Sequence, residues 1–344
     1  MKQQRVLTLV HKHLVPPDDV TGVDVTTAEW RMEHDVIRTL RESGHEVKVL
    51  GVQDELGGIR TTIHEWTPTI VFNLLESFDD VITFDQNVVS YLELLKMPYT
   101  GCNPRGLLLS RDKALSKKLL AYHRIPVPDF TVFRYGRAIR LPPRLKFPLI
   151  VKSLTYEASV GISQASIVAD EERLRKRVTF IHESLGTDAI VEQYIDGREL
   201  YVGLLGNERV RVFPVWEMHF KKMLEGDNWP IATERVKWNA TYQEKHGIHT
   251  DQAEGLPESL VDQIGRMCKR IYRALELTGY ARIDLRMDAA GRVHFIEANP
   301  NPQLAYGEDF AESAHRAGLP YGVLLDRILA LGLAWRPRQN LTGC

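Results

Sequence analysis

The first hundred residues alternate short apolar runs with segments that repeat at helical spacing. Three runs have the length and the β-branched content of buried strands, and they are residues 6–10, 47–50 and 70–73. Between the first two, residues 28–43 carry an apolar stripe of helical period, and Gly44 follows where a left-handed residue ends many helices. The alternation predicts an α/β fold built on a parallel sheet.

The pattern changes near residue 103, where the chain becomes more basic. Residues 111–123 predict a helix that ends before Pro126. Further strands are predicted at 130–135, 148–153, 200–205, 210–216, 280–287 and 292–298, and helices at 260–278 and 321–333. Strands joined by short turns favour antiparallel pairing, so the C-terminal half has α+β character. We therefore predict three domains, at residues 1–102, 103–196 and 197–340.

Composition and charge are those of an ordinary globular chain. Of 344 residues, 44 are Lys or Arg and 45 are Asp or Glu, which gives a formal net charge of -1. This balance favours neither nucleic acid nor a membrane as a partner. Cys102, Cys268 and Cys344 form no close pair in the sequence, and no signal-peptide pattern opens the chain, so we expect a reducing, cytoplasmic location.

The most informative segment is the predicted hairpin at residues 279–302. With a tight loop at 288–291, Met287 pairs with Arg292, and one face of the hairpin carries Arg282, Asp284, Glu297 and Asn299. Carboxylate and amide oxygens suit Mg²⁺, and an arginine beside them suits a phosphoryl group. The alternative interpretation is a solvated polar face on an amphipathic hairpin. Phe295 interrupts the polar side, which this alternation does not explain.

Two lysines are candidates for phosphate contacts. Lys152 closes the apolar strand 148–152 and precedes a segment of small residues that ends at Gly161, whose backbone N–H groups would allow close approach of phosphate. Lys113 lies on the basic helix. No P-loop, dinucleotide-binding or kinase motif is present in the sequence, so a nucleotide site here is of another kind. Either lysine is alternatively a surface charge.

The strand at 189–195 offers backbone groups for a purine base, and Glu199 follows as a carboxylate for a ribose. The alternative is an edge strand with exposed glutamates. In their order along the chain, these motifs resemble the ATP-grasp superfamily, and within it the D-alanine:D-alanine ligase-like carboxylate-amine ligases. The resemblance implies an N-terminal parallel-sheet domain followed by two subdomains that clasp ATP.

The resemblance also implies roles for individual residues. The predicted phosphate contacts are Lys113, Lys152, Ser159 and Lys237. The predicted adenine hinge is Glu192, Gln193, Tyr194 and Ile195, and Glu199 would hold the ribose. Arg282 would stabilise the transferring phosphoryl group, with Ser159 and Lys237 as its catalytic partners. Asp284, Glu297 and Asn299 would hold two Mg²⁺ ions, for which Mn²⁺ is a substitute.

The implied activity is ATP-dependent joining of a small-molecule carboxylate to an amine through an acyl phosphate, with release of ADP and phosphate, in an enzyme whose relatives are often homodimers. Candidate substrates are amino acids, peptides or related metabolites. Glu308 and Asp309 stand where the dipeptide ligases carry serine-bearing, carboxylate-binding residues, so they are candidate substrate contacts that favour an amine or a cationic group. Glu76, just past the carboxyl end of the predicted strand 70–73, is a further candidate substrate contact, and the alternative is a charge at a helix N-terminus. The alternatives are D-alanine:D-alanine ligase itself and a non-catalytic nucleotide-binding regulatory protein.

Overall fold

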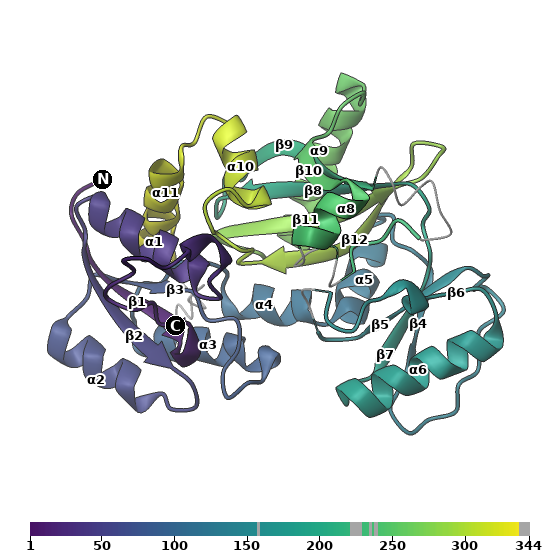
Figure 1. Ribbon diagram of the computed structural model, residues 1–344, viewed down its shortest axis with the longest axis horizontal. Coiled ribbons are helices and arrows are strands. Elements are labelled where there is room, and N and C mark those ends of the chain that lie inside the picture. Colours follow the sequence, from purple (N-terminus) through teal and green to yellow (C-terminus); the bar gives the residue numbers. More distant parts are fainter. Residues whose placement is uncertain (157–158, 221–228, 234–235, 237–239, 337–344) are drawn as a thin grey trace, which may run out of the picture.

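The computed structural model describes residues 1–156, 159–220, 229–233, 236 and 240–336. Their strands form three sheets, ordered β2-β1-β3, β4-β7-β5-β6 and β10-β9-β8-β11-β12. The three sheets occupy separate parts of the molecule (Figure 1). Each falls within one of the three segments predicted as domains, while the boundaries themselves stay a prediction.

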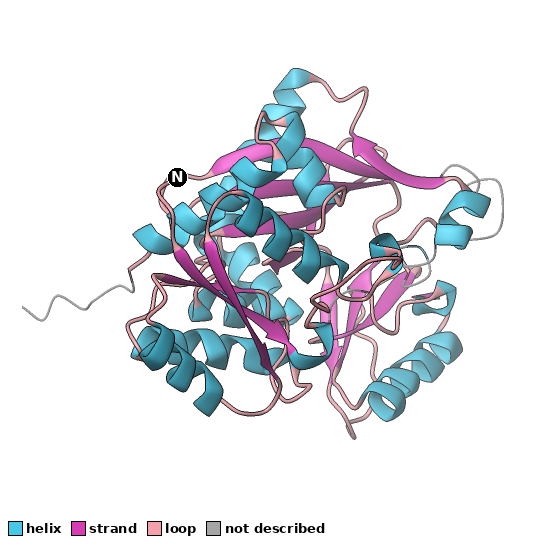
Figure 2. Cartoon of the chain, turned by 60° about the vertical axis from the view of Figure 1, so that its left-hand side comes forward, coloured by secondary structure: helices cyan, strands magenta, loops and turns pink. Residues whose placement is uncertain are grey.

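The N-terminal sheet is parallel and is buried on both faces. Its strands are β1 (Arg5–His11), β2 (Glu46–Val52) and β3 (Ile70–Asn73). One face packs on α1 (Arg31–Glu42) and on α11 (Tyr321–Ala334), which comes from the other end of the chain. The other face packs on α2 (Gly57–Trp66) and α3 (Asp85–Leu94). Helices cover both faces of the sheet (Figure 2), which explains why β1 and β3 are buried almost throughout, while the edge strand β2 is partly exposed.

The second sheet is antiparallel, and one of its faces is buried in a hydrophobic core. Its strands are β4 (Phe130–Phe133), β5 (Leu149–Ser153), β6 (Ile167–Val168) and β7 (Ala189–Gln193). Leu149, Val151 and Val191 pack against α6 (Glu171–Leu185). The alternate residues Ile150, Lys152 and Glu192 therefore point away from α6, toward the five-stranded sheet.

The five-stranded sheet is also antiparallel. Its strands are β8 (Arg198–Leu205), β9 (Arg211–Phe220), β10 (Ile248–Gln252), β11 (Tyr280–Met287) and β12 (Val293–Pro300). Val202, Ile283 and Leu285 belong to an apolar core shared with α9 (Glu258–Ala274). The opposite face is polar along β8, β11 and β12, and this face meets the second sheet.

The predicted register of the β11–β12 hairpin is wrong by one residue at its loop end. Met287 pairs with Val293 rather than Arg292, and a bulge at Ile296 shifts the register again, so that Asp284 pairs with Glu297 and Arg282 with Asn299. The bulge returns Phe295 to the apolar face opposite Leu285, where it is fully buried. It thus explains the interruption of the polar pattern and leaves the four polar side chains on one face.

Several helices join these layers. α4 (Pro104–Arg111) and α5 (Lys113–Tyr122) connect the N-terminal sheet to the other two, and α8 (Ala240–His246) and α10 (Asp309–Arg316) lie beside the five-stranded sheet (Figure 1). Within the described residues, no single helix is long and apolar enough to span a membrane, and α10 and α11 pass that test only as a pair bent by 99°.

Candidate active site

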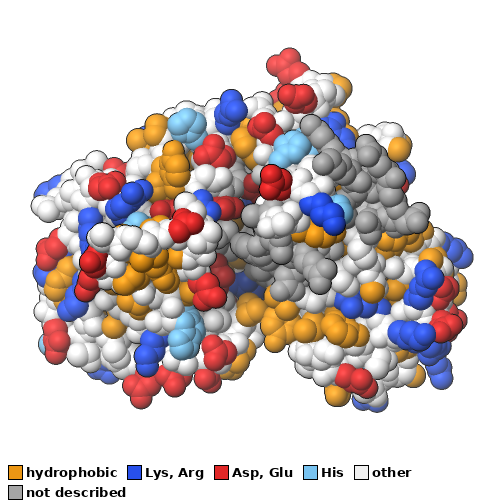
Figure 3. Space-filling view, viewed as in Figure 1, with side chains coloured by type: hydrophobic (Ala, Val, Ile, Leu, Met, Phe, Trp, Pro, Cys, Tyr) orange, Lys and Arg blue, Asp and Glu red, His pale blue; other side chains and the backbone are white. Residues whose placement is uncertain are grey.

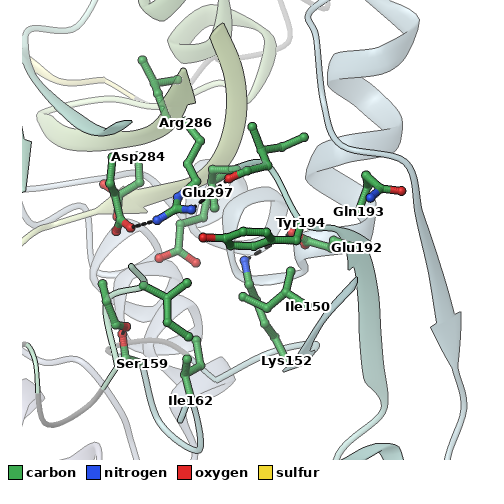
Figure 4. Close-up of a pocket in the computed structure, with 16 residues that line it drawn as sticks. Ile150, Lys152, Ser159, Ile162, Glu192, Gln193, Tyr194, Asp284, Arg286 and Glu297 are labelled. Atoms are coloured by element: carbon green, nitrogen blue, oxygen red, sulfur yellow. Dashed lines mark hydrogen bonds and ion pairs between the residues drawn. The ribbon is translucent and has the colours of Figure 1, made fainter. Parts of the chain in front are cut away.

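A pocket lies between the polar faces of the second and third sheets. The second sheet contributes Lys152 and Glu192, the connection after β7 contributes Tyr194, and the third sheet contributes Asp284, Arg286 and Glu297 (Figure 4). Between the described residues its volume is about 70 Å³, well below the roughly 300–1,000 Å³ of most ligand sites. A nucleotide therefore fits only if the facing side chains move apart.

Asp284 and Glu297 are direct cross-strand neighbours, as are Arg282 and Asn299. Adjacent carboxylates repel each other, which favours a cation between them. The buried Asn299 Nδ2 makes no hydrogen bond within the described residues, so this donor is available to a ligand. No group of three or more His, Cys, Asp and Glu side chains there has metal-site geometry, so a Mg²⁺ site would depend on the amide oxygen of Asn299.

Arg282 is held rigidly on the same face. Its Nε and Nη2 donate to the two carboxylate oxygens of Asp284 at 2.7 and 2.9 Å, and its guanidinium lies 4.6 Å from the centre of the Tyr201 ring. Burial opposes the charge of Arg282, but Asp284 more than compensates, and the pKa of Arg282 is raised above its ordinary value. The residue is a permanent cation beside the predicted metal ligands.

Lys152 and Lys117 share one buried carboxylate. The Nζ atoms lie 3.2 and 2.9 Å from the oxygens of Glu192, which is 1% exposed. Burial alone would raise the pKa of Glu192, but the two ammonium groups lower it below its ordinary value, so the carboxylate is ionised. Lys117 also donates to the carbonyl of Ile296, the bulged residue. The triad thus joins α5 to both sheets.

Ser159 lines the pocket, whereas Lys113 lies behind its wall, next to Glu297. Lys113 donates to the Tyr156 carbonyl at 2.6 Å and lies 3.9 Å from Glu297. Ser159 has a left-handed backbone (φ 63°) and donates to the Ala232 carbonyl at 2.7 Å. The predicted phosphate contact Lys237 lies outside the described residues.

Glu199 is fixed on the other side of the pocket. Arg286 lies 2.9 Å from the Glu199 carboxylate, and the Tyr201 hydroxyl donates to it at 2.8 Å. The Arg286 guanidinium also lies 5.2 Å from the centre of the Tyr194 ring, so it connects the predicted hinge to the predicted ribose contact. The Gln193 side chain donates to the Pro148 carbonyl. Ile195, next to Tyr194 in the chain, also lines the pocket.

Sequence reasoning missed Arg286, Lys117 and Tyr201. Arg286 continues the alternation of Arg282 and Asp284 along β11, and period two would have placed it on the polar face. Lys117 lies four residues after Lys113, on the same side of α5. Nothing in the sequence marked Tyr201 as a site residue, because tyrosines are found in hydrophobic cores as well as in functional sites.

A second, larger cavity adjoins Arg282 and Asn299 and has a volume of about 570 Å³. Glu76, Glu308 and Asp309, the candidate substrate contacts, all line it. Arg31 on α1 lies 3.1 Å from Glu308, and the Thr250 hydroxyl donates to Asp309. The structure therefore brings the three candidates together within reach of the predicted reaction centre.

Comparisons with known proteins agree with this arrangement. Residues 119–330 match the family model described as D-ala D-ala ligase C-terminus. An uncharacterized protein of Sinorhizobium fredii, y4sG, is 32% identical over 88% of this chain and 87% of its own length. D-alanine–D-alanine ligase of Desulforudis audaxviator is 28% identical over 87% of this chain and 85% of its own length. A D-alanine–D-alanine ligase of Bacillus anthracis, solved with ATP, superposes with a TM-score of 0.72 at 22% identity, covering 96% of this chain and 98% of that one.

The fold, with two sheets facing each other across a pocket lined by lysines and carboxylates, is that of the ATP-grasp class. Within that class, the chain belongs to the D-alanine–D-alanine ligase family of ATP-dependent carboxylate-amine ligases. The prediction of an ATP-grasp enzyme is confirmed, and with it the family's cofactors, ATP and Mg²⁺. The regulatory, non-catalytic alternative is thereby disfavoured.

Proposed function

We propose that this enzyme joins a small-molecule carboxylate to an amine through an acyl phosphate and releases ADP and phosphate. The observation that carries the proposal is the pairing of Asp284 with Glu297 and of Arg282 with Asn299 on one polar face. Lys152 faces this surface from the second sheet. Cations and oxygen ligands are thus gathered at one point, as transfer of a phosphoryl group requires.

The residues supply binding and charge stabilisation. Lys113 and Lys152 would contact the phosphates of ATP, Glu192 to Ile195 the adenine and Glu199 the ribose. Asp284, Glu297 and Asn299 would hold Mg²⁺, which neutralises phosphate charge and polarises the transferred group. Arg282, held in position by Asp284, would stabilise negative charge that develops on the phosphoryl group and then on the tetrahedral intermediate.

The test measures which nucleotide is produced. Supplied with ATP, Mg²⁺ and pairs of amino acids or dipeptides, the enzyme should release ADP and phosphate in equal amounts, and only when both substrates are present. Release of AMP and pyrophosphate would exclude an acyl phosphate. Glu297→Gln should lower kcat by at least about a hundredfold, because a metal ligand is lost. Glu208→Gln, an exposed change in the turn after β8, is the matched control and should leave kcat unchanged.

D-alanine–D-alanine ligase is the second candidate, favoured by the names of relatives such as that of Desulforudis audaxviator. It predicts ADP release with D-alanine as the sole amino acid. Glu308 and Asp309 argue against it, because they present carboxylates to a substrate end that would itself carry one. No ADP release at high D-alanine concentration would eliminate this candidate.

A further inference from the structure

The larger cavity, here called the acidic cavity, is the natural place for the substrates because Arg282 and Asn299 form part of its wall. Its volume of about 570 Å³ falls within the roughly 300–1,000 Å³ of small-molecule sites. The other charged residues of its lining are Glu29, Glu33, Glu76, Arg111, Glu308 and Asp309. The cavity therefore offers a substrate mainly negative charge.

The two guanidinium groups of the lining are already engaged. Arg111 lies 2.5 Å from Asp85, and Arg282 binds Asp284, and neither of these aspartates lines the cavity. Each of these cations is thus offset locally. Arg31, from outside the lining, pairs with Glu308, but the five lining carboxylates outnumber it, so the potential in the cavity is negative. A group of acidic side chains is also visible where the N-terminal part of the molecule meets the five-stranded sheet (Figure 3).

Glu33 distinguishes this cavity from an ordinary acidic surface. It lies in the first turn of α1, is 1% exposed, and lines the cavity. Neither of its carboxylate oxygens has a hydrogen-bond partner on another of the described residues. Burial, together with Glu76, raises its pKa to about 7. A buried carboxylate without a partner is costly for the folded chain, and a cationic ligand would remove that cost.

We propose that one substrate of this enzyme carries a cationic group, an ammonium or guanidinium beyond the reacting amine or carboxylate, which binds Glu33 in the acidic cavity. The inference rests on the proposed ligase function and narrows its substrate class to basic amino acids and related compounds. Glu76, Glu308 and Asp309 complete an environment that favours positive charge over a neutral isostere.

The experiment is calorimetric titration of the full-length protein at pH 8, where Glu33 is ionised. The probes are lysine, ornithine and arginine in both configurations, and the controls are their neutral counterparts norleucine, norvaline and citrulline. At least one basic compound should bind at least about tenfold more tightly than its counterpart, as a charge-assisted hydrogen bond to a buried carboxylate provides.

Glu33→Gln should abolish that preference, since it keeps the shape of the side chain and removes the charge. Glu42→Gln, at the exposed end of the same helix, is the matched control and should retain it. Glu76→Gln is a second variant, on an exposed residue, and should weaken the preference in the same direction if Glu33→Gln fails to fold. Equal binding of basic and neutral compounds, no binding of any basic probe, or a preference that survives Glu33→Gln would overturn the proposal.

Failure of this inference and failure of the ligase function give different results. Binding of lysine without any release of ADP and phosphate would retain the cation site and refute the ligase. Turnover with neutral substrates and no preference for basic ones would retain the ligase and refute the cation site.

Discussion

At the residue scale, Glu33 couples the proposed substrate site to stability. Its pKa is about 7 in the folded protein against an ordinary value of 4.5, so the folded chain holds the extra proton between these pH values. The free energy of unfolding therefore falls as pH rises through this window. The expected loss is about 3 kcal/mol, at roughly 1.4 kcal/mol per pKa unit.

Urea unfolding of the wild type and of Glu33→Gln checks this prediction. The two proteins should have similar stability at pH 4.5, and the variant should be the more stable one at pH 8, since glutamine carries no charge to bury. A difference that is the same at both pH values would contradict the assignment. Glu42→Gln should follow the wild type throughout.

Sequence reasoning located Asp284, Glu297, Asn299 and Arg282 correctly on one face because the two register changes, one at the loop and one at the bulge, add up to two residues and so restore each side chain to its predicted face. It could not show that Glu192 is held by Lys117 and Lys152. That contact joins residues 75 and 40 positions apart, from a helix and a neighbouring strand, and no local period relates them. The burial of the Glu33 carboxylate was hidden for the same reason, since burial depends on the whole fold.

At the element scale, α11 owes its position to a glycine. A Cβ added at Gly332 would lie 2.3 Å from the Tyr99 carbonyl and 2.9 Å from the Ile70 side chain. Alanine normally stabilises a helix relative to glycine, by up to about 1 kcal/mol. Here Gly332→Ala should instead destabilise the protein by about 1–3 kcal/mol, because the helix must move away from the sheet.

Gly322→Ala is the internal control for this prediction. It lies on the same helix, and its nearest neighbours would be 3.7 Å from the new Cβ, which is ordinary contact. Chemical denaturation should show unchanged or slightly raised stability for this variant. Equal effects of the two substitutions on stability would mean that close packing of α11 against the sheet does not explain the requirement for glycine at position 332.

The elements that sequence reasoning found carry a strong local signal: β3 is a continuous apolar run, β11 alternates polar and apolar residues, and α11 is an apolar segment long enough for a helix. Those it missed have weak signals: α2 begins with two glycines, α4 is only 8 residues long, and α10 follows the acidic pair that was interpreted as substrate contacts. The bulge at Ile296 was also invisible, because one extra residue leaves composition unchanged and alters only the pairing.

At the scale of the whole molecule, the two ends of the chain stabilise each other. Val6, Val10, Ile70 and Phe72 are fully buried in a core that includes Leu325 and Ile328 of α11. Residues 1–102 expressed alone should therefore expose this face, bind a hydrophobic dye and unfold without a sharp transition. A fusion that adds residues 309–336 through a flexible linker should restore cooperative unfolding, as followed by circular dichroism.

A sharp transition in the 1–102 fragment alone would contradict that prediction and would support an independent N-terminal domain. The result also bears on the predicted domain boundaries, because the predicted domain 197–340 contains α11, which covers one face of the N-terminal sheet. Sequence reasoning divided the chain in sequential order, and long-range packing of this kind has no local signature.

The bulge at Ile296 limits how the length of this chain can vary. Deletion of Ile296 would make the ladder regular and still leave Glu297 opposite Asp284, at the loss of the carbonyl that binds Lys117. Deletion of Ala298 would carry Asn299 to the apolar face, because every later side chain reverses. Among homologous chains, a one-residue gap should therefore be tolerated at the position of Ile296 and excluded at the position of Ala298.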